Sequence, residues 1–462
     1  MKAIIPDLDA RSAKSLYIQL YEYIRDAILK KEIVPFEKLP SLRNLSDTLG
    51  ISITTVELAY DQLTVEGYIY SRPHSGYYVS EMYYPEETKG SNDRGEAPGR
   101  GEPMEMQAPG LFCDPSSFSF TKWKKCMNKV LNDHRDSLMF ESDTQGEEAL
   151  RYEISKYVYS SRGVKCTPDQ IVIAAGTQQI TSHIAKILKR MDIEHVAVEE
   201  PGYLPVINIF RDRGFAITPV EVRTDGIDIE RLPSNIRTAA YVNPSNQFPT
   251  GSVMPAGKRY RLIDWAVKNG SYIIEDDYDS ELRYFGRPVP ALQGLDTRDC
   301  VIYLGSFSST LLQSIKISYM VLPPDMLRIF DSIRGGYDQT CSKAEQLTLA
   351  LFMEEGHYRA GIRKMRQLYS RKLKVTLDAL SDHKDIVEPV NTASGLNMII
   401  HISSGKSMSE LSAEAREAGV VANPMVPVTS GPHANSLIFY YSLIPLEDIP
   451  RAVYMMVDRW ES

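Results

Sequence analysis

The sequence predicts a multi-domain protein. A small N-terminal domain of helices and a hairpin is followed by a large α/β domain with a small C-terminal α+β part. Residues 15–67 carry apolar residues at helical spacing, with capping residues between the helices. Residues 80–110 are rich in proline, glycine and charge. From about residue 112, short β-rich runs alternate with helical segments, which is typical of a largely parallel central sheet.

The bulk composition is that of a globular protein. The chain has 462 residues, of which 43% are hydrophobic and 24% charged, and a net charge of −8 gives no overall indication of nucleic-acid binding. Five cysteines without CxxC spacing favour reduced thiols, a cytoplasmic location and no metal site. No secretory signal and no run of 18 apolar residues is present, so no membrane association is expected.

The N-terminal domain is expected to contain three helices. Residues 15–31 form the first, because their apolar residues recur at helical spacing. Ser41 is a good N-cap for a second helix that ends at Gly50. Ser52 caps a third helix, which Gly67 closes.

Residues 68–70 and 77–79 can then pair as a hairpin, and this order of elements makes a winged helix-turn-helix. In that motif the N-terminal end of the second helix of the pair enters the major groove. The expected DNA-contacting residues are Arg43, Ser52, Ile53, Thr54, Thr55, and, at the wing, His74, Ser75 and Gly76. A small helical dimerisation domain is the alternative. The charge of residues 1–80, with nine basic and ten acidic residues, favours that alternative.

This stretch resembles the GntR superfamily of bacterial regulators. The matching features are Pro40-Ser41-x-Arg43-x-Leu45, Ser52-x-x-Thr55-Val56, Ala59-Tyr60-x-x-Leu63, Glu66-Gly67 and Gly76-x-Tyr78-Val79. The resemblance implies binding to double-stranded operator DNA. The family commonly has an arginine after the serine that opens the recognition helix. Ile53 stands there in this chain, so we expect one phosphate or guanine contact to be lost.

Residues 81–111 are expected to be a flexible linker. Four prolines, five glycines and many charges between residues 80 and 110 leave little to bury. The linker separates a DNA-binding domain, residues 1–80, from a domain at 112–462, which divides into a large part at about 112–339 and a small part at about 340–462.

Strands of the large part are expected at 171–173, 196–198, 239–242, 272–274, 301–304 and 317–322. Ligands of parallel α/β sheets bind at the carboxyl ends of the strands. Polar or glycine-containing stretches follow these strands here. They are Gly176-Thr177-Gln178, Glu200-Pro201-Gly202-Tyr203, Asn243 to Gly251, Glu275 to Asp279, and Ser306-Phe307-Ser308-Ser309.

Together with Tyr303 to Pro323, these stretches resemble the aminotransferase-like domain of fold-type-I pyridoxal phosphate (PLP) proteins. More narrowly, the chain resembles the MocR-type (GabR-like) regulators, which join a GntR-like winged helix to such a domain. Further matches are Arg162-Gly163-Val164, Pro249-Thr250-Gly251 and Gly356-His357-Tyr358. The resemblance covers nearly the full length apart from the linker, and it implies a homodimer.

The resemblance also implies roles for single residues. Asp276 would face the pyridine nitrogen of PLP and Tyr278 the ring oxygen. The other residues of the implied pocket are Gly176, Thr177, Gln178, Tyr203, Asn243, Ser306, Ser308, Ser309 and Lys316. Lys316 stands where the family usually has a phosphate-anchoring arginine, and a lysine keeps the charge but loses the bidentate fork. Ser442 aligns with an arginine that holds the carboxylate of the effector in GabR-like members.

Ser309 stands where the family has the lysine that binds PLP covalently. A hydroxyl cannot form that link, so we expect no catalytic residue and PLP that is bound non-covalently or is absent. Lys316 as a substitute amine is disfavoured, because it is expected in an alternating strand with Ile315 and Ile317 pointing the other way. An engineered lysine replacement at Ser309 is a further alternative, although the accompanying Lys316 and Ser442 changes favour natural divergence.

The sequence therefore predicts a DNA-binding transcriptional regulator with a non-catalytic sensor domain for a small effector, such as an amino acid or a compound related to vitamin B6. One alternative is a regulator that binds PLP, or a PLP–amino acid adduct, without a covalent bond. A working PLP-dependent aminotransferase is the second alternative. Ser309 opposes it, because transamination needs a lysine as covalent partner and proton carrier.

Overall fold

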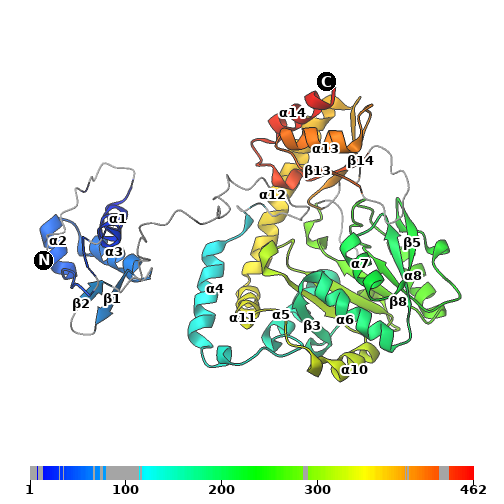
Figure 1. Ribbon diagram of the computed structural model, residues 1–462, viewed down its shortest axis with the longest axis horizontal. Helices are drawn as coiled ribbons and strands as arrows, with labels where there is room; N and C mark the ends of the chain where they lie inside the picture. Colours follow the sequence, from blue (N-terminus) through cyan, green and yellow to red (C-terminus); the bar gives the residue numbers. More distant parts are fainter. Residues whose placement is uncertain are drawn as a thin grey trace, which may run out of the picture. The chain divides into compact units, whose positions relative to one another are not determined.

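The computed structural model describes the chain except residues 1–7, 9–13, 31, 35, 66–67, 73–75, 80–113, 115–116, 285–289, 391, 393–394, 426–435 and 462. The chain forms two compact units, Met1–Glu105 and Met106–Ser462 (Figure 1). The predicted linker at 81–111 lies outside the described residues, so its boundaries stay predictions.

The N-terminal unit has the predicted order of three helices and a hairpin. Ser41 accepts a hydrogen bond from the backbone N–H of Asn44 at 3.3 Å, and Gly50 ends the same helix with φ +64°. Both are the expected capping interactions. Ser52 likewise accepts from the N–H of Thr55 at 3.1 Å. The elements are α1 (Leu16–Leu29), α2 (Leu42–Leu49), α3 (Ile53–Val65), β1 (Ile69–Arg72) and β2 (Gly76–Val79).

A core of its own holds this unit together. Leu20 and Ile24 of α1 meet Val56 and Tyr60 of α3, and all four are fully buried. The Tyr60 hydroxyl is satisfied by donating to the carbonyl of Pro40 at 3.0 Å. The predicted winged helix-turn-helix is thus confirmed.

The C-terminal unit is built on an eight-stranded sheet with the order β3-β10-β9-β8-β7-β4-β5-β6. The strands β4, β5, β7, β8 and β9 are parallel, whereas β10 runs antiparallel to both of its neighbours. The loop between β9 and β10 is too short for a crossover helix, which is why these strands are antiparallel. The strands are β3 (Ile171–Ala175), β4 (His195–Glu200), β5 (Ala216–Arg223), β6 (Gly226–Ile227), β7 (Thr238–Val242), β8 (Tyr272–Asp277), β9 (Val301–Ser306) and β10 (Ile317–Val321).

Helices cover both faces of this sheet. Ile171 and Ile173 of β3 point into one apolar core and Val172 into another, as strand alternation requires. One face carries α5 (Glu148–Arg162), α8 (Ala256–Lys268), α9 (Leu292–Leu295), α11 (Lys343–Glu354) and the start of α12 (His357–Leu380). The other face carries α6 (Gly176–Arg190), α7 (Leu204–Asp212) and α10 (Pro324–Ile333). Helix α4 (Phe120–Asp133) packs on α11.

Helix α12 connects the large part to the small one (Figure 1). Its Met365 and Tyr369 belong to the core of the large part, whereas Leu373 and Leu380 belong to the core of the small part. The small part has an antiparallel sheet covered by two helices. Its elements are β11 (Val387–Val390), β12 (Met398–Ile402), β13 (Ala422–Pro424), β14 (Ser436–Phe439), α13 (Met408–Glu417) and α14 (Ile449–Glu461).

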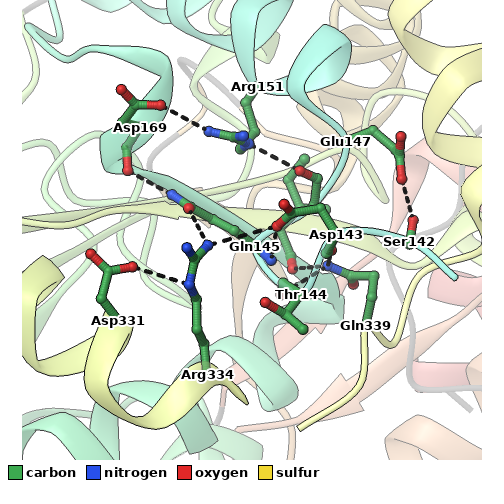
Figure 2. A network of polar contacts seen from close by, with 12 residues as sticks. Ser142, Asp143, Thr144, Gln145, Glu147, Arg151, Asp169, Asp331, Arg334 and Gln339 are labelled. Atoms are coloured by element: carbon green, nitrogen blue, oxygen red, sulfur yellow. Dashed lines mark hydrogen bonds and ion pairs between the residues drawn. The ribbon is translucent and has the colours of Figure 1, made fainter.

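A polar network fixes the segment that precedes β3 (Figure 2). Arg334 donates to the Gln145 side-chain oxygen at 3.0 Å, and Gln145 donates to the carbonyls of Asp169 and Ile171. The backbone N–H of Ile173 in turn donates to the Gln145 carbonyl at 2.9 Å. Gly146 has φ +103°, and a Cβ there would lie 2.6 Å from the Ile173 side chain. The segment therefore lies directly against the sheet.

Among the described residues, no helix combines the length and the apolar character that crossing a membrane requires.

Candidate functional site

Three of the predicted pocket residues meet at one edge of the sheet because of strand register. Ile317 of β10 pairs with Ala175 of β3, and Ser318 pairs with Ser306 of β9. Gly176 follows β3 and Lys316 precedes β10, so both lie at the edge where Ser306 ends β9. Because β10 runs antiparallel to both β3 and β9, its start lies beside the ends of these two strands.

Helix α6 begins at this edge with free backbone N–H groups. Gly176 is its first residue, with φ +79°, and Thr177 and Gln178 complete the first turn. The N-terminus of a helix attracts anions through these N–H groups and the helix dipole. A Cβ on Gly176 would lie 3.9 Å from Cδ of Lys316, so the lysine side chain passes beside the helix start. This is a suitable place for a phosphate.

The predicted setting of Lys316 inside a strand is wrong. A 3-10 turn, η6 (Gln313–Ile315), precedes it, and Lys316 itself has φ +49° in the left-handed region. Strand β10 begins only at Ile317. A residue in the left-handed region commonly ends a helical turn. Ile315 and Ile317 therefore belong to different elements, although their alternation is typical of one strand.

Hydroxyl groups gather at the same edge. Ser318 donates to the Ser306 hydroxyl at 3.0 Å, and the N–H of Ser308 donates to the same oxygen at 3.3 Å. The sequence-based interpretation did not include Ser318, although its position in an otherwise apolar strand is an available indication.

Asp276 lies buried near the end of β8. Burial raises the pKa of its carboxyl to about 6, partly offset by a hydrogen bond from the Tyr241 hydroxyl. Its backbone carbonyl accepts from the Asn243 side chain at 3.0 Å. A buried carboxylate whose charge is not neutralised favours a cationic partner, and a protonated pyridine ring would supply one. Tyr241 was not predicted, and it reaches Asp276 from the neighbouring strand β7.

Ser309 and Tyr278 are in direct contact. The Ser309 hydroxyl donates to the backbone carbonyl of Tyr278, and only 1% of Ser309 is exposed. The Tyr278 ring hydroxyl accepts from the Asn246 side chain at 3.3 Å. Burial raises the pKa of Tyr278 well above its usual value, so the ring is a neutral phenol. The hydroxyl of Ser309, the residue that the resemblance places at the position of the family lysine, is thus engaged with the backbone.

Aromatic rings form a wall beside these groups. Tyr203 and Phe248 meet edge to face at 5.9 Å between ring centres, and Phe248 meets Tyr278 at 6.4 Å. Tyr203, one of the expected pocket residues, lies in the same row of rings as Tyr278.

Glu199 is a buried acid that the sequence-based site lacks. Its Oε2 accepts from the backbone N–H of Asn243 at 3.1 Å and from Gln247 at 3.2 Å. Its Oε1 has no hydrogen-bond partner among the described residues. Burial is the main cause that raises the pKa of Glu199 to about 8. The acid is therefore mostly protonated at neutral pH and supports the Asn243 loop.

A buried ion pair supports the opposite side of β8. Arg162 binds Asp277 at 2.7 Å, and the Tyr303 hydroxyl donates to the same carboxylate oxygen at 2.7 Å. Arg162 also donates to Ser245 at 2.5 Å, which ties the 243–251 loop to α5. These contacts hold the loop that carries Asn243 and Asn246.

Ser442 is fully buried in η9 (Tyr441–Leu443), a short 3-10 turn after β14. Strand β14 ends before this turn, at Phe439. The buried amine of Lys372 donates to the Ser442 carbonyl at 2.8 Å and forms an ion pair with Asp114 at 2.7 Å.

In the N-terminal unit, the expected DNA-contacting residues Arg43, Ser52, Ile53 and Thr54 are exposed, and Ile53 has 45% of its surface in contact with solvent. Thr55 is half-buried, and its hydroxyl lies 2.8 Å from that of Ser52. Gly76 begins β2. His74 and Ser75 lie outside the described residues.

Comparisons with known proteins agree with this architecture. Residues 16–79 match the family of bacterial regulatory proteins named gntR, and residues 110–436 match aminotransferase class I and II. The chain is 35% identical to the HTH-type transcriptional regulator YhdI of Bacillus subtilis, over 99% of this chain and 98% of that protein. It is 33% identical to the probable rhizopine catabolism regulatory protein MocR of Rhizobium meliloti, over 80% and 78% of the two chains.

The C-terminal unit also has solved structural neighbours. The α-aminoadipate aminotransferase LysN of Thermus thermophilus, in complex with N-(5'-phosphopyridoxyl)-L-leucine, matches with a TM-score of 0.68 and 24% identity. The match covers 76% of this chain and 91% of LysN, and it shows the fold. With a GntR winged helix and an aminotransferase-like domain in one polypeptide, the chain belongs to the MocR-type transcriptional regulators of the GntR family.

Proposed function

We propose that this regulator binds PLP, or a PLP–amino acid adduct, without a covalent bond, and that this binding controls its affinity for operator DNA. The observation that carries the proposal is the combination at one site of a buried Asp276 with a buried Ser309 that donates to the Tyr278 carbonyl. The groups that would hold a pyridine ring are kept, and the group that would bind it covalently is replaced.

The donor set fits PLP. Asp276 would pair with the ring nitrogen, and the Tyr278 hydroxyl would reach the ring oxygen. The start of α6, with Ser306, Ser308 and Lys316 beside it, would hold the phosphate. When bound, PLP supplies an electron-withdrawing ring and an aldehyde.

Catalysis of transamination is disfavoured by the same residues. The reaction needs an amine that both bonds to the cofactor and moves a proton. Ser309 has a neutral hydroxyl, and Lys316 lies beside Gly176 at the phosphate end. We therefore propose that the site orients and recognises its ligand and excludes water, and that Lys316 acts as a phosphate anchor.

Ser442, the residue expected to contact the effector, is buried in this structure. Ser442 has no solvent-exposed surface, and its hydroxyl has no hydrogen-bond partner among the described residues. Contact with an effector would require the 441–443 turn to separate from Leu396, whose carbonyl accepts from the Ser442 N–H at 3.4 Å. Movement of the small part on ligand binding would provide such an opening.

We also propose a homodimer that acts in the cytoplasm, where operator DNA is found in bacteria. Apolar side chains are exposed along α4 and after it, at Phe120, Leu131, Met139 and Phe140. Exposed apolar side chains that gather in one patch are typical of a subunit interface, and these residues are the candidates.

The experiment is a titration of the purified full chain with PLP, followed by absorbance and by retardation of an operator fragment. We expect saturable binding that borohydride does not make covalent, and a change in operator affinity at saturation. Asp276→Ala should abolish the binding, whereas Asp225→Ala, a surface carboxylate beside Lys258, should not.

Two outcomes would contradict the proposal. Absence of any PLP uptake would favour a sensor that has lost the cofactor. Measurable transamination of an amino acid by the wild-type chain would favour the enzyme.

A further inference from the structure

Three side chains of types that can bind a metal meet where α4, α11 and α12 join. Cys126 comes from α4, Glu355 follows α11, and His357 opens α12. The Cys126 sulfur lies 3.9 Å from Oε2 of Glu355, and Nε2 of His357 lies 3.1 Å from the same oxygen. All three ligand atoms lie within 4.8 Å of one another.

These separations are close to those of a zinc site. With Zn–S at about 2.3 Å and Zn–N and Zn–O at about 2.0–2.2 Å, the ligand atoms of a tetrahedral site lie about 3.4–3.6 Å apart. Small rotations of the side chains would bring the observed 3.9 Å and 3.1 Å to those values. Sulfur, imidazole and carboxylate are also the ligand types that zinc accepts.

The turn between α11 and α12 holds two of the ligands in place. Gly356 has φ +74°, and Glu355 and His357 stand on either side of it. The second carboxylate oxygen of Glu355 faces the amine of Lys129 at 3.6 Å, which leaves Oε2 directed toward the thiol and the imidazole. The ring of His357 also packs edge to face on Phe352. The ligands are therefore oriented before any ion binds.

Cys126 is buried and donates a hydrogen bond to Glu355. Only 1% of the residue is exposed, and its thiol points at a carboxylate. Lys125 and Lys129 are neighbours of Cys126 on α4. A bound divalent ion would stabilise the thiolate and the carboxylate together. The two negative charges would balance the two charges of the ion, although the nearby lysines reduce the attraction.

A cavity adjoins the cluster and leaves room for a fourth ligand. It has a volume of about 350 Å³, and His357 is part of its lining. The polar residues Ser117, Ser119, Lys122 and Thr310 also line it. A water molecule or a small anion held by these groups could complete the coordination from this side.

We propose that Cys126, Glu355 and His357 bind one zinc ion, with the fourth ligand supplied from the cavity. The ion links α4 to the start of α12, the helix that continues into the small part. Its binding stabilises the folded unit, because the unfolded chain does not bring together ligands that are 229 residues apart. The proposal departs from the expectation, based on cysteine spacing, that the chain has no metal site.

The test is a titration of untagged, metal-stripped full chain with Co²⁺, which replaces zinc and reports thiolate coordination by a charge-transfer absorption band. We expect one equivalent per chain, displacement by Zn²⁺, and a Zn²⁺-dependent rise in the thermal unfolding midpoint. Cys126→Ser should remove the band. His357→Gln should weaken Co²⁺ binding by at least tenfold and remove the Zn²⁺-dependent rise. The matched control is Cys341→Ser, another buried thiol, which should leave the band unchanged.

Several results would overturn the proposal. They are a wild-type chain that takes up no Co²⁺, a band that persists in Cys126→Ser, or a band that Cys341→Ser removes. If Cys126→Ser does not fold, His357→Gln decides, because His357 is only half-buried and is not part of the core. Unchanged Co²⁺ affinity in that variant would exclude the three-residue site.

Discussion

Single side chains decide what the cofactor site can do. Ser309 is enclosed and donates to the Tyr278 carbonyl, whereas Asp276 of β8, two residues before Tyr278, has a buried carboxyl with a raised pKa. Under the proposed function, recognition of a pyridine ring and covalent capture of its aldehyde are separable, because they would depend on different residues.

Ser309→Lys should give a PLP adduct that borohydride reduces, because the new amine would stand beside Tyr278, at the position that the resemblance assigns to the family lysine. The measurement is a mass increase of the protein after PLP and borohydride treatment. Ser309→Met is the control, since it adds a side chain of similar length without an amine. No mass increase for the lysine variant would show that the pocket has diverged beyond this residue.

Glu199 should make stability depend on pH. Its folded pKa, about 8, is above the usual 4.5, so the stability that it contributes is present below pH 4.5 and is lost as pH rises to 8. Glu199→Gln removes this dependence. Relative to the variant, the unfolding free energy of the wild type should fall by about 1 kcal/mol per pH unit in that range.

Urea unfolding of both chains at several pH values measures the difference. Glu221→Gln is the control, because Glu221 is exposed on β5. A constant difference between wild type and Glu199→Gln from pH 5 to pH 8 would contradict the raised pKa.

Secondary-structure elements position these residues through their ends. The start of α6, the end of β9 and the turn before β10 meet because β10 is antiparallel to both neighbours. The segment before β3 is held just as closely by Gln145 and Arg334 (Figure 2). At such ends the backbone often adopts a positive φ, which glycine tolerates better than other residues, as at Gly146 and Gly176.

Gly146→Ala should destabilise the C-terminal unit by about 2–4 kcal/mol, because it combines a left-handed backbone with a clash against Ile173. Gly214→Ala is the matched control. Gly214 also has a positive φ, of +73°, but a Cβ there would meet nothing within 4 Å, so it should cost only about 1–2 kcal/mol. Chemical denaturation measures the unfolding free energy of both variants. Equal losses of unfolding free energy would show that Ile173 accommodates the added Cβ without cost.

Ile53→Arg should strengthen operator binding, because Ile53 is exposed in the first turn of α3, where the family commonly has arginine. One added phosphate contact should steepen the salt dependence of log K by about 0.9. Leu58→Arg adds the same charge further along the helix and should have a smaller effect. Retardation assays at several salt concentrations measure both variants. Unchanged affinity of Ile53→Arg would contradict the proposed placement of α3.

The whole molecule consists of two units with separate cores. Leu20, Ile24 and Tyr60 belong to a core formed by residues up to Val79, and the other described core clusters contain only residues from Cys126 onward. Each unit therefore buries its own apolar surface, as an independently folding domain does.

A fragment of residues 112–462 should bind PLP as tightly as the full chain and should not retard operator DNA. The reason is that the proposed pocket residues all lie in the C-terminal unit. Parallel titrations of fragment and full chain measure this. A folded fragment that has lost PLP binding would show that the N-terminal residues contribute to the site.

The sequence by itself determined the features that depend on neighbouring residues. Ser41, Gly50 and Ser52 cap helices as expected, and the six predicted strands are present. Capping, alternation and helical spacing act over a few residues, so a linear pattern records them.

Only the tertiary structure decided which distant residues meet. Tyr241 reaches Asp276 from another strand, Lys316 leaves the expected strand for a left-handed turn, and Cys126 joins two residues that lie 229 and 231 positions further along the chain. These contacts depend on strand order, register and helix packing. Such long-range geometry follows from burying the whole apolar surface at once, and no local pattern in the sequence records it.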